Sequence, residues 1–545
     1  MQRRDIKMTD VMQVAIIGAG VSGLTALKSC LEEGLEPVCF ERCEEIGGMW
    51  YADDNMYPSS SPKPYPSLVT NTSKMMSCFS DFPFSKDTTT FMTPKMIHDY
   101  LLSYVDQFKL RKYIQFKTEV HKVSKARDFD ETGNWEVAIH DSNGKSRVEV
   151  FNAVVICSGY FKKPRYPDIE GMGSFQGKIE HAINFKTGEA YRDKNVVVVG
   201  NSFSAGDIAV AAAEYANQVY VSVGRGCVVL RRFDDNGWPW DMQVFRRVYS
   251  SSWTVVYLLK IVRKITSIAL NHDAVGIHSE KPFPFCPFML NDDVGSRIMT
   301  GKVKVVGTVV RMAEKSVHID DGTVVDDVDV VVFATGYDRH LPFLDNSLVD
   351  SAQAINEQKN EWYKLIFPVH LQHPTLAMVG MATGEGSNLP IYEMQSRLAA
   401  RVLCGKHKLP AKNTMLKDID RWNSYFKFKF SYYKHQVPYL PYIEELAAEL
   451  GVKPTFCRLF WWKPRLAYLC IFGPASPLQY RLIGPHSNAE AINHCSAIYE
   501  NTFSGVRHRR VPPRKPITLC PSFITILIPV AFTIAAYYVW KTYFL

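Results

Sequence analysis

The chain has 545 residues, of which 46% are hydrophobic and 22% are charged, and this composition indicates a large folded protein of two or more domains. The net charge of +8, without a recognition motif or dense basic stretch, argues against nucleic acid and fits anionic small molecules or a membrane surface. The twelve cysteines form no C-x-x-C pair, which predicts free thiols and excludes a disulfide reductase. Histidine and cysteine spacings predict no metal site.

A strand, a glycine-rich turn and a helix begin the chain, in VAIIGAGVSG at Val14 to Gly23. In a G-x-G-x-x-G turn the first glycine allows the bend, the second lets the backbone approach a pyrophosphate, and the third lets helix and strand pack closely. The helix N-terminus then binds the phosphates. The predicted cofactor-binding residues of this turn are Gly18, Ala19, Gly20, Val21, Ser22 and Gly23.

The next strand, EPVCFER, ends in Glu41. It follows the turn by about 20 residues, where an acceptor for a ribose 2′-hydroxyl belongs. A carboxylate repels a 2′-phosphate, so the first turn should bind FAD or NAD rather than NADP.

A second strand, turn and helix occupy Asn195 to Tyr215. Gly200 begins the turn, but Ser202 and Ala205 stand at the second and third glycine positions. Both residues are small, so a dinucleotide can still approach across a slightly wider turn. The following strand leads to Arg225 instead of an acid, and a guanidinium binds a 2′-phosphate through paired hydrogen bonds. We therefore predict FAD at the first turn and NADPH at the second.

Two further buried-type strands, NAVVICSGY (Asn152 to Tyr160) and DVDVVVFATGY (Asp327 to Tyr337), resemble each other. Repeated βαβ signals predict parallel sheets with helices on both faces. We expect an α/β fold with two Rossmann-like dinucleotide-binding domains, the FAD domain being interrupted by the NADPH domain, and a C-terminal transmembrane helix. The expected parts are 1–160 (FAD domain, first part), 161–335 (NADPH domain), 336–450 (FAD domain, second part), 451–515 (C-terminal extension) and 516–541 (membrane tail).

The C-terminal tail carries no charge from Pro516 to Trp540, and about 20 apolar residues cross a bilayer. The basic stretch RHRRVPPRK precedes it, whereas only Lys541 follows. Positive charge marks the cytoplasmic side, so we expect a single membrane helix with a cytosolic body. The alternative is a buried C-terminal helix.

Two other stretches mix apolar, aromatic and cationic residues: Ser250 to Leu270, within a predicted insertion near 250–290, and Phe456 to Gly473. Such segments lie on a membrane interface or form amphipathic core helices. The first stretch leaves both alternatives open. In the second, adjacent Trp461 and Trp462 favour membrane contact.

Several motifs together resemble the flavin-containing monooxygenase family over nearly the whole chain. FQGKIEHAINF, with Phe175, Gly177, His181 and Phe185, matches the identifying sequence F-x-G-x-x-x-H-x-x-x-(Y/F) of this family. GGMW is similar to its flavin-contacting GG-x-W, and TNTSKMMSCFSDFPF to its active-site segment. LNDDVGSRI, FATGY and PIYEMQSR resemble later landmarks, and the apolar tail is typical of animal microsomal members.

The resemblance implies a mechanism. NADPH reduces FAD, the reduced flavin and O2 form a C4a-hydroperoxyflavin that bound NADP+ shields, and a soft amine or sulfide attacks its distal oxygen. It assigns the catalytic role to Asn71, whose amide would hydrogen-bond the oxygenated flavin. It places FAD against Gly48, Met49, Trp50, Asn71, Thr72 and Gln395. The predicted NADP-binding residues are Gly200, Ser202, Ser204, Ala205, Gly206, Asp207 and Arg225.

The resemblance and the tail predict an N- or S-oxygenase of the endoplasmic reticulum membrane, active on small lipophilic amines or sulfides in xenobiotic metabolism. The oligomeric state, including a dimer, stays open. For His181 and Phe185 we favour a structural role at the domain junction over acid–base catalysis. Two departures from the family pattern are the altered second turn and Lys74-Met75, where the family often has Lys-Glu.

Three other functions stay open. One is Baeyer–Villiger oxygenation of ketones, although enzymes of that type carry Trp where Phe185 stands. Another is an NADPH oxidase that releases hydrogen peroxide. The third is a membrane-tethered protein that holds flavin without turnover.

Overall fold

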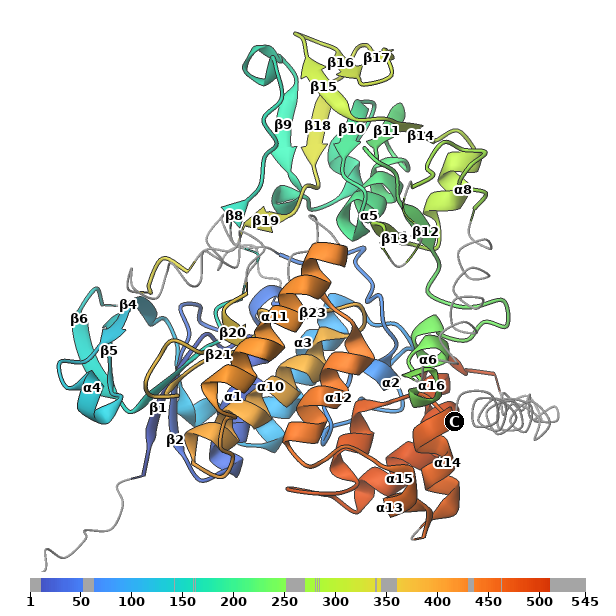
Figure 1. Ribbon diagram of the computed structural model, residues 1–545. Helices are drawn as coiled ribbons and strands as arrows, with labels where there is room; N and C mark the ends of the chain where they lie inside the picture. The colour runs from blue at the N-terminus through green and yellow to red at the C-terminus, as the bar shows by residue number, and fades with distance from the viewer. Residues whose placement is uncertain are drawn as a thin grey trace, which may run out of the picture. The chain divides into compact units, whose positions relative to one another are not determined.

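The computed structural model (Figure 1) describes residues 11–51, 63–141, 143–159, 161, 163–250, 270–279, 281, 283, 285–338, 341–344, 360–429, 436–461 and 463–509. The chain forms two compact units, residues 1–505 and 506–545. The elements named below belong to the first unit. The predicted membrane tail 516–541 and most of the stretch 250–270 lie outside the described residues.

A five-stranded parallel sheet has the order β22-β7-β1-β2-β3. Its strands are β1 (Gln13–Ile17), β2 (Glu36–Phe40), β3 (Ile114–Gln115), β7 (Ala153–Ile156) and β22 (Leu376–Met378). Every residue of β7 and β22 is buried, as expected for strands that are covered on both faces.

A second five-stranded parallel sheet has the order β14-β11-β10-β18-β9. Its strands are β9 (Lys178–His181), β10 (Asn195–Val199), β11 (Gln218–Ser222), β14 (Val303–Val306) and β18 (Val330–Phe333). All of them lie between β7 and β22 in the chain, so the first sheet is completed only after the second has been made. The prediction of an α/β fold with two Rossmann-like sheets is confirmed in this respect.

The chain crosses between the two sheets twice. β8 (Lys163–Pro164) follows the first sheet, and β19 (Tyr337–Asp338) follows the second. The two strands pair antiparallel, Tyr337 opposite Pro164. The two crossings therefore lie side by side.

Smaller sheets and bridging strands complete the strand set: β4 (Glu119–Lys125), β5 (Trp135–His140), β6 (Ser146–Phe151), β12 (Val228–Leu230), β13 (Phe288–Leu290), β15 (Val309–Met312), β16 (Val317–Ile319), β17 (Val324–Val325), β20 (Trp362–Tyr363), β21 (Phe367–Pro368), β23 (Thr383–Gly384) and β24 (Gln436–Val437). The longer helices are α1 (Val21–Glu32), α3 (Pro94–Gln107), α5 (Phe203–Ala212), α10 (Asn388–Leu403), α11 (Lys412–Lys429), α12 (Tyr439–Glu449) and α14 (Pro464–Phe472). The short helices are α2 (Lys74–Ser77), α4 (Phe129–Thr132), α6 (Trp240–Val244), α8 (Val294–Met299), α13 (Phe456–Phe460), α15 (Glu490–Ser496) and α16 (Ile498–Thr502).

Helix α10 lies along α1 (Figure 1). At this contact the Thr25 hydroxyl hydrogen-bonds the Ser396 hydroxyl at 2.8 Å. Both side chains are fully buried. This contact fixes the helix that follows the first glycine turn.

No helix within the described ranges is long and apolar enough to cross a bilayer.

Candidate active site

The first glycine turn, between β1 and α1, is too crowded for side chains. Gly18 has a φ of +100°, and a Cβ there would lie 2.8 Å from the carbonyl oxygen of Cys157. A Cβ on Gly23 would lie 1.7 Å from the carbonyl oxygen of Gly18. The first and third glycines therefore have the roles that the motif predicts, the bend and the close approach of helix to strand.

The second glycine faces another glycine. A Cβ on Gly48 would lie 3.1 Å from the Cα of Gly20, and Gly47 donates its N–H to the carbonyl oxygen of Ala19 at 3.0 Å. No side chain caps the N-terminus of α1, which starts at Val21. Backbone N–H groups beside a bare glycine surface suit a pyrophosphate, so these residues fit the phosphates of a dinucleotide.

Glu41 lies directly after β2 and is 7% exposed. Its Oε2 accepts the N–H of Ala19 at 2.6 Å, and its Oε1 accepts the N–H of Cys43 at 2.9 Å. A carboxylate has about four lone-pair positions, so the two oxygens keep capacity for a ribose hydroxyl. The predicted acceptor thus lies against the turn that it should serve.

Gln395 was predicted to neighbour the flavin, and it lies close to the first glycine turn. Its amide oxygen accepts the N–H of Gly380 at 3.1 Å, and its amide nitrogen donates to the Tyr442 hydroxyl at 2.7 Å. A Cβ on Gly380 would in turn lie 2.3 Å from the Ser22 hydroxyl oxygen. Gln395 therefore supports a residue behind the first turn. Met49 is 37% exposed, and Trp50 is half-buried and ends the short 3-10 helix Gly48–Trp50.

The second glycine turn, between β10 and α5, has more room. Gly200 has a φ of +157°, and a Cβ there would lie 2.6 Å from the carbonyl oxygen of Ala334. The methyl group of Ala205 is fully buried beside this turn. Ser202 precedes α5, and no side chain caps that helix. The turn thus keeps one essential glycine and accepts a methyl group where the first turn accepts none.

Arg225 is exposed in the turn that follows β11. The side-chain amide of Asn201 donates to the carbonyl oxygens of Val223, at 3.1 Å, and Gly226, at 3.4 Å. These bonds hold the Arg225 turn against the glycine turn. Exposed Ser204 lies in the first turn of α5. The arrangement fits a dinucleotide that carries a 2′-phosphate.

Asp207 on α5, which was predicted to contact NADP, is hydrogen-bonded to two protein groups. The Tyr65 hydroxyl donates to Oδ2 at 2.5 Å, and the Asn291 amide donates to Oδ1 at 2.7 Å. Burial raises the pKa of this carboxyl. Asp207 therefore links α5 to the segment that leads to Asn71, while its neighbour Gly206 is buried.

Asn71 lies in the segment before α2, and Arg232 holds this segment through hydrogen bonds. The Arg232 guanidinium donates to the Asn71 amide oxygen at 3.1 Å, to the Thr70 carbonyl oxygen at 3.1 Å and to the Asp292 carboxylate at 2.8 Å. The Thr72 hydroxyl hydrogen-bonds Ser77 at 2.8 Å. Because the Asn71 oxygen accepts from arginine, its NH2 group is left to donate to another partner.

Sequence reasoning missed Arg232 and Asp292. Arg232 and Asn71 are 161 positions apart, and a charged residue in a loop carries no periodic signal. The stretch LNDDVGSRI, which contains Asp292, was noted only as a landmark.

The comparisons with known proteins decide the family. The sequence profile of the flavin-binding monooxygenase-like family matches residues 11–540. This chain belongs to that family. N-oxide-forming dimethylaniline monooxygenase 2 of Rattus norvegicus is 42% identical over 484 residues, 87% of this chain and 89% of its own. Flavin-containing monooxygenase 1 of Sus scrofa is 38% identical over 509 residues, 92% of this chain and 94% of its own.

Solved structures agree. The S-allyl-L-cysteine S-oxygenase from Allium sativum superposes with a TM-score of 0.62 at 25% identity, over 91% of this chain and 99% of its own. Cyclohexanone monooxygenase from Rhodococcus sp. Phi1, bound to NADP+, shares the fold, with a TM-score of 0.56 at 19% identity over 82% of this chain and 98% of its own. The protein is a flavin monooxygenase, an oxidoreductase whose family is consistent with FAD, NADPH and O2 as cofactors and oxidant.

In this monooxygenase, His181 of the identifying sequence lies at the crossing between the two sheets. Its Nδ1 accepts the N–H of Ile183 at 3.2 Å, so Nε2 carries the proton and donates to the Gly336 carbonyl oxygen at 3.0 Å. Burial lowers the pKa of His181. The Phe185 ring contacts the Tyr65 ring edge-on at 5.1 Å. These contacts favour the predicted structural role.

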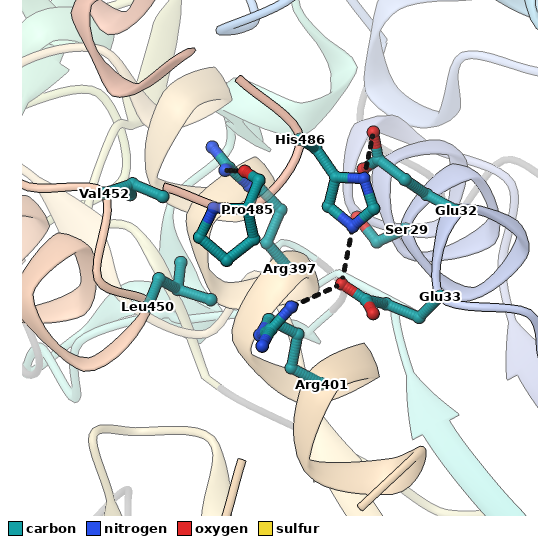
Figure 2. A pocket seen from close by; sticks show the side chains of 9 residues that line it. All are labelled: Ser29, Glu32, Glu33, Arg397, Arg401, Leu450, Val452, Pro485 and His486. Carbon is teal, nitrogen blue, oxygen red and sulfur yellow. Dashed lines mark hydrogen bonds and ion pairs between the residues drawn. The ribbon is translucent and has the colours of Figure 1, made fainter. Parts of the chain in front are cut away.

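A cavity at the far end of α1 is lined by charged residues of the monooxygenase that pair with one another (Figure 2). His486 contacts Glu33 at 2.9 Å and Glu32 at 3.6 Å, and Arg401 contacts Glu33 at 3.2 Å. These contacts give the polar side chains of the cavity protein partners. Across the described ranges, no group of histidine, cysteine and acidic side chains is arranged to hold a metal.

Proposed function

We propose that this monooxygenase transfers one oxygen atom from O2 to a soft nucleophilic nitrogen or sulfur of small lipophilic molecules, with NADPH as reductant. Bound FAD would supply the redox chemistry, accepting hydride and activating O2. The names of two relatives, an N-oxide-forming monooxygenase and an S-oxygenase, support the choice of nitrogen and sulfur. The observation that carries the proposal is the oriented amide of Asn71.

The chain's own residues would divide the work between two dinucleotides. The Gly20–Gly48 cradle and the N-terminus of α1 would hold the FAD phosphates, and Glu41 would accept from its ribose. The N-terminus of α5 and Arg225 would hold NADPH, the guanidinium pairing with the 2′-phosphate. Ser202 and Ser204 add hydroxyl groups at that helix start.

Asn71 would act at the oxygen-transfer step. A donor that the protein fixes in advance stabilises charge as it develops, and in a water-excluded site this is worth a few kcal/mol. Arg232 fixes the donor by holding the amide oxygen at 3.1 Å. The NH2 group of Asn71 would therefore stay pointed at the reacting atoms.

Product analysis tests the reaction. The purified, FAD-loaded enzyme is given NADPH and, in turn, an amine, a sulfide and a ketone, and product is scored against NADPH consumed. Oxygenated amine or sulfide supports the proposal. Ester from the ketone alone would indicate a Baeyer–Villiger enzyme, and hydrogen peroxide alone would indicate an oxidase.

Asn71→Leu tests the role of the amide, because leucine is close in size but lacks the donor and the acceptor. NADPH should still bleach the flavin at a measurable rate, since hydride transfer places its charge on the flavin ring and not on the oxygen that Asn71 would contact. Loss of a few kcal/mol at the oxygen step should divert consumed NADPH to hydrogen peroxide. Stopped-flow absorbance and a peroxide assay measure the two steps. Unchanged coupling would make Asn71 an ordinary loop residue.

We also propose the domain limits 1–160, 161–335, 336–450 and 451–515, with 516–541 as the anchor in the endoplasmic reticulum membrane and a cytosolic body. The order of strands in the two sheets supports the interrupted FAD domain. The uncharged tail supports the anchor.

The corner between α13 and α14 supports a second membrane contact. Trp461 is 87% exposed and Phe460 is 40% exposed, and exposed cationic residues flank them, namely Arg458, Lys463 and Arg465. The opposite face of α14 is buried, with Leu466 at 3% exposure. An aromatic corner with basic neighbours suits a lipid headgroup region.

Removal of residues 516–545 tests the anchor. The truncated protein should bind membranes more weakly yet retain FAD, because the nucleotide turns lie far upstream. Flotation with liposomes and the flavin absorbance report the two properties. Residual binding that Trp461→Ala abolishes would assign it to the α13–α14 corner, whereas loss of flavin would make the tail part of the fold.

A further inference from the structure

The segment that carries Asn71 is also held at its other end, by Asp241 on α6. Ser73 donates its backbone N–H to Asp241 Oδ2 at 2.7 Å and its hydroxyl to the same oxygen at 3.0 Å. Met242 donates its N–H to Oδ1 at 2.9 Å. Ser73 is the residue before α2, so the carboxylate holds the backbone directly ahead of the helix that follows the Asn71 segment.

Arg232 and Asp241 lie nine positions apart in the chain, and they hydrogen-bond two residues, Asn71 and Ser73, that are two positions apart. Arg232 holds the Asn71 amide oxygen, and Asp241 holds Ser73. Between them, Thr72 accepts the Thr70 hydroxyl at its carbonyl oxygen, at 3.0 Å. A shift of Ser73 is therefore transmitted to Asn71 through two short peptide links.

Asp241 is 1% exposed and Ser73 is fully buried. Nearby cations have other partners: Lys74 donates to the carbonyl oxygens of Lys86 and Thr88, and Arg247 pairs with Glu444 at 2.9 Å. Backbone and hydroxyl dipoles are thus what the described residues offer to balance the carboxylate.

The Tyr439 hydroxyl is a titratable group near Asp241, and the Cys78 thiol interacts with that hydroxyl. Burial, and then the charges of Cys78 and Asp241, raise the pKa of the Tyr439 hydroxyl. Burial, and then Glu393, raise the pKa of the Cys78 thiol. Both groups therefore stay neutral near neutral pH, and the group in this cluster that changes charge is Asp241, because burial raises its pKa to about 6.

We propose that Asp241 is a positioning residue for oxygen transfer: its charged carboxylate holds Ser73 and thereby keeps the Asn71 amide aimed at the reacting flavin edge. This inference rests on the proposed function of Asn71. Uptake of a proton replaces charge-assisted hydrogen bonds by weaker neutral ones, so the Asn71 segment loosens and consumed NADPH is diverted to hydrogen peroxide.

Protonation of Asp241 has opposite effects on its positioning role and on the stability of the fold. The folded-state pKa of Asp241 lies above that of an ordinary carboxyl, so protonation stabilises the folded chain relative to its ionised form. Below about pH 6 this group therefore stabilises the fold while the grip on Ser73 weakens. The amount of oxygenated product per NADPH consumed should therefore fall with the pH, although protonation of Asp241 does not unfold the protein.

Asp241→Asn tests the proposal in the full-length, FAD-loaded protein. Asparagine has the same shape, but its NH2 group faces an N–H donor in either orientation. The matched control is Asp234→Asn, in the turn that precedes α6. The Asp234 carboxylate accepts the N–H groups of Asn236 and Trp238, both at 2.9 Å, and an amide oxygen can replace it.

Two readouts are measured from about pH 5.5 to 8. The first is peroxide formed per oxygenated product. In the parent it should rise as the pH falls through about 6, whereas in Asp241→Asn it should be about tenfold higher at neutral pH, the effect of one lost charge-assisted bond, and independent of pH. The rate of flavin reduction by NADPH should be the same in the parent and in Asp241→Asn.

The second readout is amide hydrogen exchange of peptides that cover 70–77, compared between variants at equal pH. Exchange should be faster in Asp241→Asn and unchanged in Asp234→Asn. Ser73→Ala, which removes one of the three bonds, should give a smaller change in the same direction.

The outcomes distinguish this proposal from the proposed function. A parent-like peroxide ratio and pH profile in Asp241→Asn would overturn the positioning role, as would unchanged exchange across 70–77. If no substrate were oxygenated by the parent, the proposed function would fail, and faster exchange in Asp241→Asn would still support the grip on Ser73.

Discussion

The two glycine turns of this chain each join a strand to a helix, but they leave different amounts of room for a side chain. At the first turn a Cβ on Gly23 would lie 1.7 Å from a backbone oxygen, so α1 approaches β1 as closely as a bare backbone permits. At the second turn Ala205 already places a methyl group in the corresponding position, and it is fully buried. The third glycine of the G-x-G-x-x-G pattern is therefore a packing requirement at the first turn, whereas the second turn accepts a small side chain at that position.

The strand ends differ in the same way. Glu41 is buried and hydrogen-bonded to the turn that it follows, at 2.6 Å. Arg225 is exposed, and Asn201 holds its loop in place. The buried acid suits a cofactor that stays bound, and the exposed cation suits one that enters and leaves with each turnover.

Gly23→Ala should have the largest effect, because the new methyl group can be placed only if α1 moves off β1. We expect loss of bound FAD and a fall in the free energy of unfolding on the order of 3 kcal/mol. Flavin absorbance and urea unfolding measure both. Retention of FAD with unchanged stability would show that the first turn can also accommodate a methyl group at the third glycine position. The two turns would then not differ in this respect.

Arg225→Ala should raise the KM for NADPH far more than the KM for NADH. Loss of a charge-assisted contact of about 1.5–3 kcal/mol corresponds to roughly a 10–150-fold change. Steady-state flavin reduction with each cofactor measures it, and Arg225→Lys, which keeps the charge but not the paired bonds, should fall between. An equal change for both cofactors would mean that Arg225 does not contact the 2′-phosphate.

Ala205→Gly should have the smallest effect. It restores the pattern of the first turn but removes a buried methyl group from α5, so we expect a loss of about 1–2 kcal/mol in stability and little change in NADPH binding. Thermal unfolding and the KM for NADPH measure these. A large gain or loss of NADPH affinity would show that the methyl group tunes the second site, contrary to the comparison.

The sequence predicted the parts of the site that are local in the chain. Gly18, Gly23 and Glu41 lie within one strand–helix–strand unit, where spacing fixes geometry. Arg232 could not be predicted in this way, since its partner Asn71 is 161 positions away and only the folded chain brings them together.

Two residues were assigned by resemblance and have contacts that spacing does not reveal. The Asp207 carboxylate binds Tyr65 and Asn291, and the Gln395 amide binds Gly380 and Tyr442. Both lie near the expected sites and hydrogen-bond neighbouring protein groups. A motif locates such residues, whereas their partners depend on packing between distant elements.

The grip on Ser73 also sets an order of events during synthesis. Ser73 and Asp241 are separated by 168 positions, and a ribosome that adds 5–20 residues per second needs roughly 10–30 s to make that stretch. Strand β22, which completes the first sheet, emerges later still. The nascent chain therefore carries its Asn71 segment for many seconds without the side chains that hold it, and the first glycine turn can form well before that segment is fixed in place.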